Sequence, residues 1–210
     1  MNTPVLYSFR RCPYAMRARL ALASAAIIVE MREILLRDKP EEMIRVSAKA
    51  TVPVLVSDGK ILDESRDIMD WALAQNDPED WLSRYDPELV FECETGFKTA
   101  LDKYKYASRF SDVNPAEQRD IAAGFLQKLD KTLTRQPFLS GADFGYTDAA
   151  IITFVRQYAN VDRNWFDRQN WPYLAKWLES FLQSKRFSFI MAKFPVWQAE
   201  NDPIYFPEHQ

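Results

Sequence analysis

The first part of the chain alternates short apolar runs, typical of strands, with stretches of helical spacing. Val5–Tyr7 is a β-favouring run, and beyond Pro13 the apolar positions recur every three or four residues, as on one face of a helix. A second run of strand character covers 29–36. A strand, a helix and a strand in this order predict a βαβ unit, with parallel strands joined by a right-handed crossover.

A β-hairpin and another helix are expected next. A short helix or turn at 39–43 leads to the strand-like run 51–56, whose proline suits the first residue or an edge of a strand. Asp58-Gly59 is a strong hairpin-turn signal, and a returning strand follows it. Helical spacing then covers 65–75.

Past residue 75 the pattern changes to helices alone. The polar, proline-bearing stretch 76–85 predicts a linker between a first domain, 1–75, and a second domain, 86–210. One helix of the second domain is apolar nearly all round, as in a buried helix, and the tail after Asn201 is expected to be an extended strap. The expected helices are 86–104, 114–133, 148–159 and 172–182.

Composition narrows the class of protein. The 210 residues carry a net charge of −3, which indicates neither a nucleic-acid partner nor binding to an anionic membrane. Every apolar run is shorter than the roughly 20 residues of a membrane-spanning helix, and no export signal is expected. Two cysteines, Cys12 and Cys93, fit a reducing compartment better than a disulfide framework, so a cytoplasmic protein is expected.

Histidine chemistry and metal binding are not expected. The only histidine, His209, is the second-last residue, which argues against a Cys–His or Ser–His catalytic pair. The sequence therefore also lacks a cluster of His and Cys ligands for a metal ion.

Cys12 is the strongest candidate for chemistry, because it stands where the first strand ends and the first helix begins. Pro13 suits the first helical position, so the sulfur is expected near free backbone N–H groups and the positive end of the helix dipole. These groups favour a thiolate, the nucleophilic form, as do Arg10 and Arg11 if they lie close. The alternative is that Cys12 is a small buried hydrophobic residue.

Three further features have both a structural and a functional interpretation. Pro53 either starts an edge strand or follows a cis bond that turns the backbone of Val52 outward toward an extended ligand. Glu64-Ser65 is a plain helix cap, an anion site at a helix N-terminus, or both. Lys39 is either a solvated surface charge or the partner of a carboxylate.

The remaining candidates fall on expected helices. Cys93 lies on an apolar stripe and is interpreted as a core residue. A group of aromatic residues either lines a hydrophobic pocket or belongs to the core, which is the commoner role of aromatics at helical spacing. The group consists of Tyr104, Tyr106, Phe110, Tyr158 and Trp165.

Taken together, these motifs resemble those of the cytosolic glutathione S-transferase superfamily, most closely its cysteine-containing, omega-like and glutaredoxin-like members. The resemblance covers almost the whole chain and depends on the order and spacing of the motifs. They are Tyr7–Tyr14, Leu36–Pro40, Thr51–Leu55, Asp63–Ser65, Gly141 and Gly145–Asp148.

The resemblance implies an α/β thioredoxin-like N-terminal domain and an all-α C-terminal domain, the glutathione S-transferase fold. It makes Cys12 the catalytic residue and glutathione the co-substrate, without a metal. Val52 would pair with the cysteinyl part of glutathione and Lys39 with its glycyl carboxylate, while Ser65 would hold its γ-glutamyl end. The full set implied for glutathione binding is Phe9, Pro13, Leu36, Lys39, Val52, Pro53, Glu64 and Ser65.

The same resemblance implies a second pocket and a partner. A hydrophobic co-substrate would lie between the two domains, and the chain would form a homodimer. The residues implied for the co-substrate pocket are Tyr14, Tyr104, Phe110 and Trp165.

Two positions depart from the patterns of related proteins. Dithiol glutaredoxins have a second cysteine where this chain has Ala15, so an internal disulfide at this site is impossible. The capping motif of the second domain normally begins with Ser or Thr, whereas here Gly145 precedes Asp148. Glycine is still an acceptable cap, at a cost of a few tenths of a kcal/mol.

The motifs and the resemblance leave three possible functions. The leading hypothesis is a glutathione-dependent thiol transferase, in which Cys12 cleaves glutathione mixed disulfides. The second is conjugation of glutathione to an electrophile. The third, from another class, is a non-catalytic module that binds protein partners.

Overall fold

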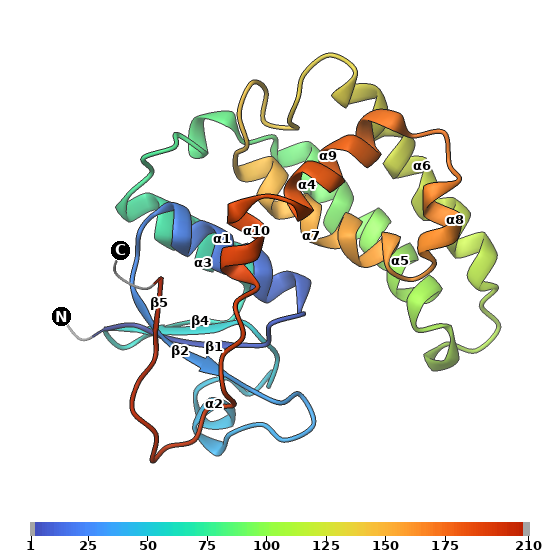
Figure 1. Cartoon of the computed structure of the whole chain (residues 1–210). Coiled ribbons are helices and arrows are strands. Elements are labelled where there is room, and N and C mark those ends of the chain that lie inside the picture. The colour runs from blue at the N-terminus through green and yellow to red at the C-terminus, as the bar shows by residue number, and fades with distance from the viewer. Residues whose placement is uncertain (1–2, 208–210) are drawn as a thin grey trace. The chain divides into compact units, whose positions relative to one another are not determined.

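The computed structural model describes residues 3–207, which form two compact units (Figure 1). The helical unit consists of residues 80–184. The sheet unit consists of the described residues on either side of it, 3–79 and 185–207.

The sheet unit contains a five-stranded sheet in the order β4-β3-β1-β2-β5. The first two strands are parallel and joined by a helix, and β3 and β4 form an antiparallel hairpin, so the predicted βαβ unit and hairpin are both confirmed. The strands are β1 (Val5–Ser8), β2 (Val29–Glu33), β3 (Val54–Ser57), β4 (Lys60–Leu62) and β5 (Tyr205–Phe206).

Helices cover both faces of this sheet. Figure 1 shows α1 (Pro13–Ser24) and α3 (Ser65–Gln75) together on one face, and α2 (Glu41–Val46) on the other. One buried cluster joins the sheet to α2 and consists of Tyr7, Ile34, Met43, Val52 and Val54. This architecture confirms the expected thioredoxin-like α/β domain.

Some predicted elements of the sheet unit are too long or displaced. The strand expected at 29–36 ends at Glu33, and Leu35 forms an isolated bridge with Asp38 instead. The strand expected at 51–56 begins only at Val54, because Val52 and the proline after it lie before the ladder. The short helix predicted at 39–43 starts after Pro40, which is its N-cap.

The C-terminal tail differs most from prediction, because it belongs to the sheet unit and not to the expected second domain, 86–210. After α10 (Lys185–Ile190) the tail returns to the sheet, where β5 pairs antiparallel with β2 (Figure 1). Trp197 N also donates to Glu33 O at 2.8 Å. The outer edge of β2 exposes backbone groups that need partners, and the tail supplies them.

The predicted linker 76–85 belongs in part to the helical unit. Trp81 is fully buried, with its ring centroid 5.6 Å from that of Phe144. The ring centroids of Tyr85 and Tyr146 lie 4.3 Å apart. These aromatic contacts anchor the segment, so the division falls after Glu79.

The helical unit confirms the expected all-helical second domain. Its first predicted helix is one run interrupted by a π-helical turn at Cys93–Phe97, and α7 is buried over most of its length, as its apolar pattern predicted. The helices are α4 (Pro87–Glu92), α5 (Lys98–Lys105), α6 (Pro115–Leu133), α7 (Tyr146–Ala159), α8 (Arg163–Asp167) and α9 (Pro172–Leu182), with 3-10 turns at Leu82–Arg84 and Ala107–Arg109.

Glycine at the N-cap of α7 has a steric reason. A Cβ placed on Gly145 would lie 2.8 Å from Cβ and Oγ of Ser140, so the usual Ser or Thr would collide with this side chain. The buried Asp148 carboxylate accepts hydrogen bonds from Gly145 N at 3.2 Å and Trp177 Nε1 at 2.8 Å. It also accepts from the N–H groups of Leu139 and Ser140.

Candidate functional site

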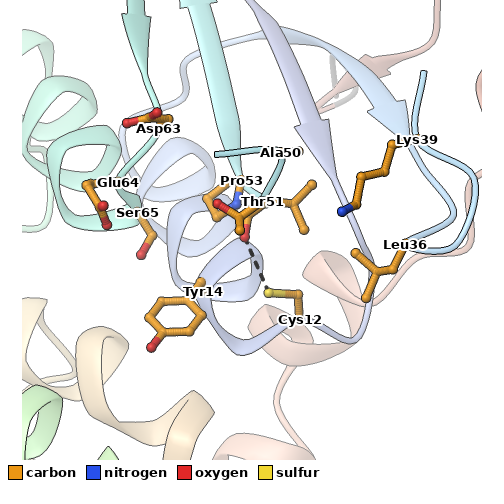
Figure 2. Close-up of a pocket in the computed structure, with 11 residues that line it drawn as sticks. Cys12, Tyr14, Leu36, Lys39, Ala50, Thr51, Pro53, Asp63, Glu64 and Ser65 are labelled. Carbon is orange, nitrogen blue, oxygen red and sulfur yellow. Dashed lines mark hydrogen bonds between the residues drawn. The ribbon is translucent and has the colours of Figure 1, made fainter. Parts of the chain in front are cut away.

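A cavity of about 470 Å³ opens in the sheet unit beside the start of α1 (Figure 2). Four segments supply its walls: the turn between β1 and α1, the loop after β2, the loop that leads into β3, and the N-terminus of α3. The lining residues are Cys12, Tyr14, Leu36, Lys39, Ala50, Thr51, Val52, Pro53, Asp63, Glu64 and Ser65.

Cys12 occupies the N-cap of α1 and faces this cavity. Pro13 is the first residue of the helix, as predicted, and Cys12 O accepts the bond from Met16 N at 2.9 Å. The thiol is partly exposed, and Sγ donates to Val52 O at 3.6 Å, the dashed line in Figure 2. Cys12 packs against the core cluster but is only partly buried, unlike the buried residue of the alternative interpretation.

A cation that the sequence did not single out, Arg19, acts on Cys12. Arg11 is exposed, and its guanidinium lies 5.8 Å from the centre of the Phe9 ring. Arg19 is fully buried instead, and its charge interacts with the Cys12 thiolate. Sequence reasoning missed it because an arginine in the middle of a helix is usually solvated. Its spacing of seven residues, two helical turns from Cys12, was the available signal.

The segment before β3 has the geometry expected of it. The Val52-Pro53 bond is cis, which is the functional alternative of the two, and both residues line the cavity. Ala50 and Thr51, which precede them, line it too and were not predicted.

Ser65 begins α3 but does not cap it, so the capping interpretation of its hydroxyl is wrong. The N-cap is Glu64, and no side chain caps this helix. Ser65 Oγ accepts a hydrogen bond from Arg17 Nε at 2.9 Å, and both residues are buried. The first backbone N–H groups of a helix have no intrahelical acceptor, so the start of α3 is able to receive an anion.

Two carboxylates at this end of the cavity share one ammonium. Lys49 Nζ lies 3.0 Å from Asp63 Oδ1 and 2.7 Å from Glu64 Oε1. Hydrogen bonds from Lys49 and from Ser47 hold the pKa of Asp63 below its usual value. Sequence reasoning gave neither Lys49 nor Asp63 a role in the site, because their proximity depends on the tertiary fold.

The opposite end of the cavity is cationic. Figure 2 shows Lys39 and Leu36 on one side of Cys12, and Glu64 and Ser65 on the other. A thiol thus lies between a cation and a group of carboxylates next to a helix N-terminus. This order of charges suits an extended peptide with charged groups at both ends and sulfur near its middle.

Two residues predicted to bind glutathione lie outside the lining of the cavity. Pro13 is buried at the start of α1. Phe9 packs against the core cluster around Tyr7 and Ile34. Their side chains support the turn that carries Cys12, which explains the motif without placing them in the cavity.

The residues expected for a co-substrate are divided between the two units. Tyr14 lines the cavity, with the Arg17 guanidinium 5.3 Å from its ring centre. In the helical unit, Tyr104 and Trp165 both pack on Tyr158, at centroid distances of 5.6 and 6.2 Å. Phe110 is 40% exposed, and the co-substrate pocket stays a prediction.

The other sequence-based candidates add no chemistry. Cys93 is fully buried in the helical unit, as predicted for a core residue. His209 lies outside the described residues. Within residues 3–207, no group of three His, Cys, Asp or Glu side chains is arranged to hold a metal ion. No helix in this range has the length and apolar character needed to cross a membrane.

Comparison with known proteins agrees with the fold. Residues 6–81 match the family described as Glutathione S-transferase, N-terminal domain, and residues 79–180 match Glutathione S-transferase, C-terminal domain. Glutathione S-transferase U19 of Arabidopsis thaliana is 27% identical over 87% of this chain and 86% of its own. Protein IN2-1 homolog A of Oryza sativa subsp. japonica is 27% identical over 97% of this chain and 83% of its own.

A solved structure shares the fold. A glutathione transferase family member from Pseudomonas fluorescens, crystallised with two glutathione molecules, has a TM-score of 0.76 at 16% identity. The match covers 90% of this chain and 92% of the other. With both domains of the family matched in order along the chain, the protein belongs to the glutathione S-transferase superfamily.

Proposed function

We propose that this protein is a glutathione-dependent thiol transferase of the cysteine-containing, omega-like kind. The observation that carries the proposal is the position of Cys12, at the N-cap of α1 and on the wall of the cavity. A thiolate there is favoured by the helix N-terminus and by the buried charge of Arg19.

Glutathione fits the order of charges along the cavity. Its glycyl carboxylate would meet Lys39, near Leu36, and its γ-glutamyl end would meet Glu64 and Ser65. The Ser65 hydroxyl accepts from Arg17 and still has its own proton to donate to a carboxylate. In this pose the cysteinyl part of glutathione lies along Val52, which brings its sulfur toward Cys12.

The reaction proceeds by two thiol–disulfide exchanges. The Cys12 thiolate attacks the glutathione sulfur of a mixed disulfide, the old S–S bond breaks, and the substrate thiolate leaves and takes up a proton. A second glutathione, as its thiolate, then attacks the Cys12–glutathione disulfide. Oxidised glutathione leaves and the Cys12 thiolate is restored, so electrons and atoms balance.

The residues near Cys12 explain why glutathione must resolve the intermediate. Ala15 stands where a dithiol enzyme has its second cysteine, and Cys93 is buried within the helical unit. Neither position offers a thiol to the mixed disulfide.

Cys12→Ser tests the proposal directly. The hydroxyl stays neutral and forms no disulfide, so reduction of the mixed disulfide of glutathione and 2-mercaptoethanol should fall to background. Glutathione binding, measured by calorimetry, should persist because Val52, Glu64 and Ser65 are unchanged. Cys93→Ala is the matched control and should keep the activity. Retention of the reductase activity in Cys12→Ser would overturn the proposal.

Conjugation is the second candidate, favoured by the names of the relatives, which include glutathione S-transferases. A conjugating enzyme would respond to the same variant in the opposite way. The serine donates a hydrogen bond to the glutathione thiolate, so activity toward a chlorodinitrobenzene should persist or rise. A protein with neither activity and no affinity for glutathione would be a binding module instead. A homodimer and a cytoplasmic location are predictions that accompany the proposal.

A further inference from the structure

The turn that carries Cys12 is held by two charged side chains from inside the sheet unit. Arg10 N donates to Glu33 Oε1 at 2.6 Å, and Arg19 Nη2 donates to Arg10 O at 2.6 Å. Arg19 Nη1 also donates to the hydroxyl of Ser8. Both backbone polar groups of Arg10, two residues before Cys12, are thus fixed by side chains that are at least nine-tenths buried.

We propose that Arg19 and Glu33 are positioning residues for Cys12, which hold its turn and set the ionisation of its thiol in opposite directions. The guanidinium of Arg19 stabilises the thiolate, and the carboxylate of Glu33 opposes it. This inference rests on the proposed role of Cys12, but it concerns the thiol alone and does not depend on the substrate.

Arg19 is unusual for an arginine in the middle of a helix. It is 1% exposed, and its Nε has no hydrogen-bond partner. Burial lowers the pKa of Arg19 to about 10, while the charges of Glu33 and of the Cys12 thiolate act in the other direction. The group remains a cation at neutral pH, in surroundings where a charge acts on its neighbours more strongly than in water.

Glu33 interacts with Arg19 and so offsets the positive charge that Arg19 presents to Cys12. It is 8% exposed, and its Oε2 is buried without a hydrogen-bond partner. Burial raises the pKa of Glu33, while the N–H of Arg10 and the charge of Arg19 lower it. Glu33 also borders a second cavity, of about 240 Å³, whose other charged lining residues are Arg10, Arg11 and Lys193.

Several other groups face Cys12 and can affect its pKa, so the test must leave them unchanged. The Val52 carbonyl accepts from the thiol and so favours its neutral form. Around the cavity, the charged side chains are those of Lys39, Asp63 and Glu64. These groups stay the same in every variant below, so a change in the Cys12 pKa reports on Arg19 and Glu33.

The pH dependence of Cys12 alkylation tests the proposal. Rates with iodoacetamide are measured on the full chain by mass spectrometry of the Cys12 peptide, between pH 5 and 10. Arg19→Met should raise the Cys12 pKa by about one unit, which slows alkylation about tenfold at low pH. Glu33→Gln should lower this pKa and speed alkylation about threefold. Arg19→Lys keeps the charge and should lie near the wild type.

Arg11→Met is the matched control, because Arg11 is a cation of the same turn whose side chain is exposed. It should leave the Cys12 pKa unchanged within about 0.2 units. Opposite shifts in Arg19→Met and Glu33→Gln are the expected result, since a purely structural loosening of the turn moves both variants the same way. Shifts of one sign, or none, overturn the proposal.

Two features keep this test decisive. If Arg19→Met does not fold, Glu33→Gln decides alone, because an unchanged or raised Cys12 pKa in that variant contradicts the opposing role of Glu33. Alkylation needs no disulfide substrate. A wild type that lacks mixed-disulfide reduction would therefore count against the proposed function, and leave the shifts in thiol pKa to be judged separately.

Discussion

Replacing Ser65 with alanine distinguishes a buried hydrogen bond from a helix cap. In the structure Ser65 Oγ accepts from Arg17 Nε at 2.9 Å between two buried residues, and it does not cap α3. A hydrogen bond to a charged group contributes about 1.5–3 kcal/mol. We therefore expect Ser65→Ala to lower the free energy of unfolding by about this amount.

Urea unfolding, followed by tryptophan fluorescence and by far-ultraviolet circular dichroism, measures this loss. The two probes also report whether the two units unfold together, which a single free energy requires. Ser188→Ala is the matched control in the same unit, because the hydroxyl of Ser188 is exposed and bonds to Lys185 O. Its effect should stay within about 0.5 kcal/mol.

A double-mutant cycle isolates the contact between Ser65 and Arg17. Arg17→Met removes the donor, so Ser65→Ala should cost much less in that background than in the wild type. We expect a coupling free energy of about 1–3 kcal/mol, the range found for residues in direct contact. Additive losses in the double variant would refute the assignment of the hydroxyl to Arg17.

Three further predictions concern the ends of the cavity and the second unit. Lys39→Ala should weaken glutathione binding in calorimetry with little change in unfolding, and unchanged affinity would remove Lys39 from the site. Lys49→Met should raise the pKa of Asp63 toward its usual value, because the hydrogen bond that holds it down is lost; carboxyl NMR titration measures this, and no shift would contradict the contact. Gly145→Ser should destabilise the protein by about 1–3 kcal/mol despite the better capping residue, since its Cβ meets Ser140; a gain in urea resistance would show that Ser140 moves freely.

Local signals in the sequence were sufficient for the parts of the site that depend on neighbours in the chain. Cys12 with Pro13 predicted the helix N-cap, and Asp58-Gly59 predicted the hairpin. Both features are decided within a few residues, where backbone preferences dominate.

The parts that depend on distant contacts were not predictable in this way. Arg17 and Arg19 resemble solvated surface cations in the sequence, and only their packing against Ser65 and the Cys12 turn makes them buried. Lys49 lies far along the chain from the carboxylates that it joins. The tail has no strong strand pattern, because β5 consists of two residues and depends on the free edge of β2.

The pairing of β5 with β2 makes the sheet unit discontinuous along the chain. Val29 is opposite Phe206, so the whole helical unit is synthesised between the two halves of one sheet. On the ribosome, the first 79 residues emerge with one edge strand uncovered, and that edge is a template for pairing with other chains. This edge stays uncovered until β5 has been made, after the whole helical unit, so the chain is exposed to aggregation throughout that interval.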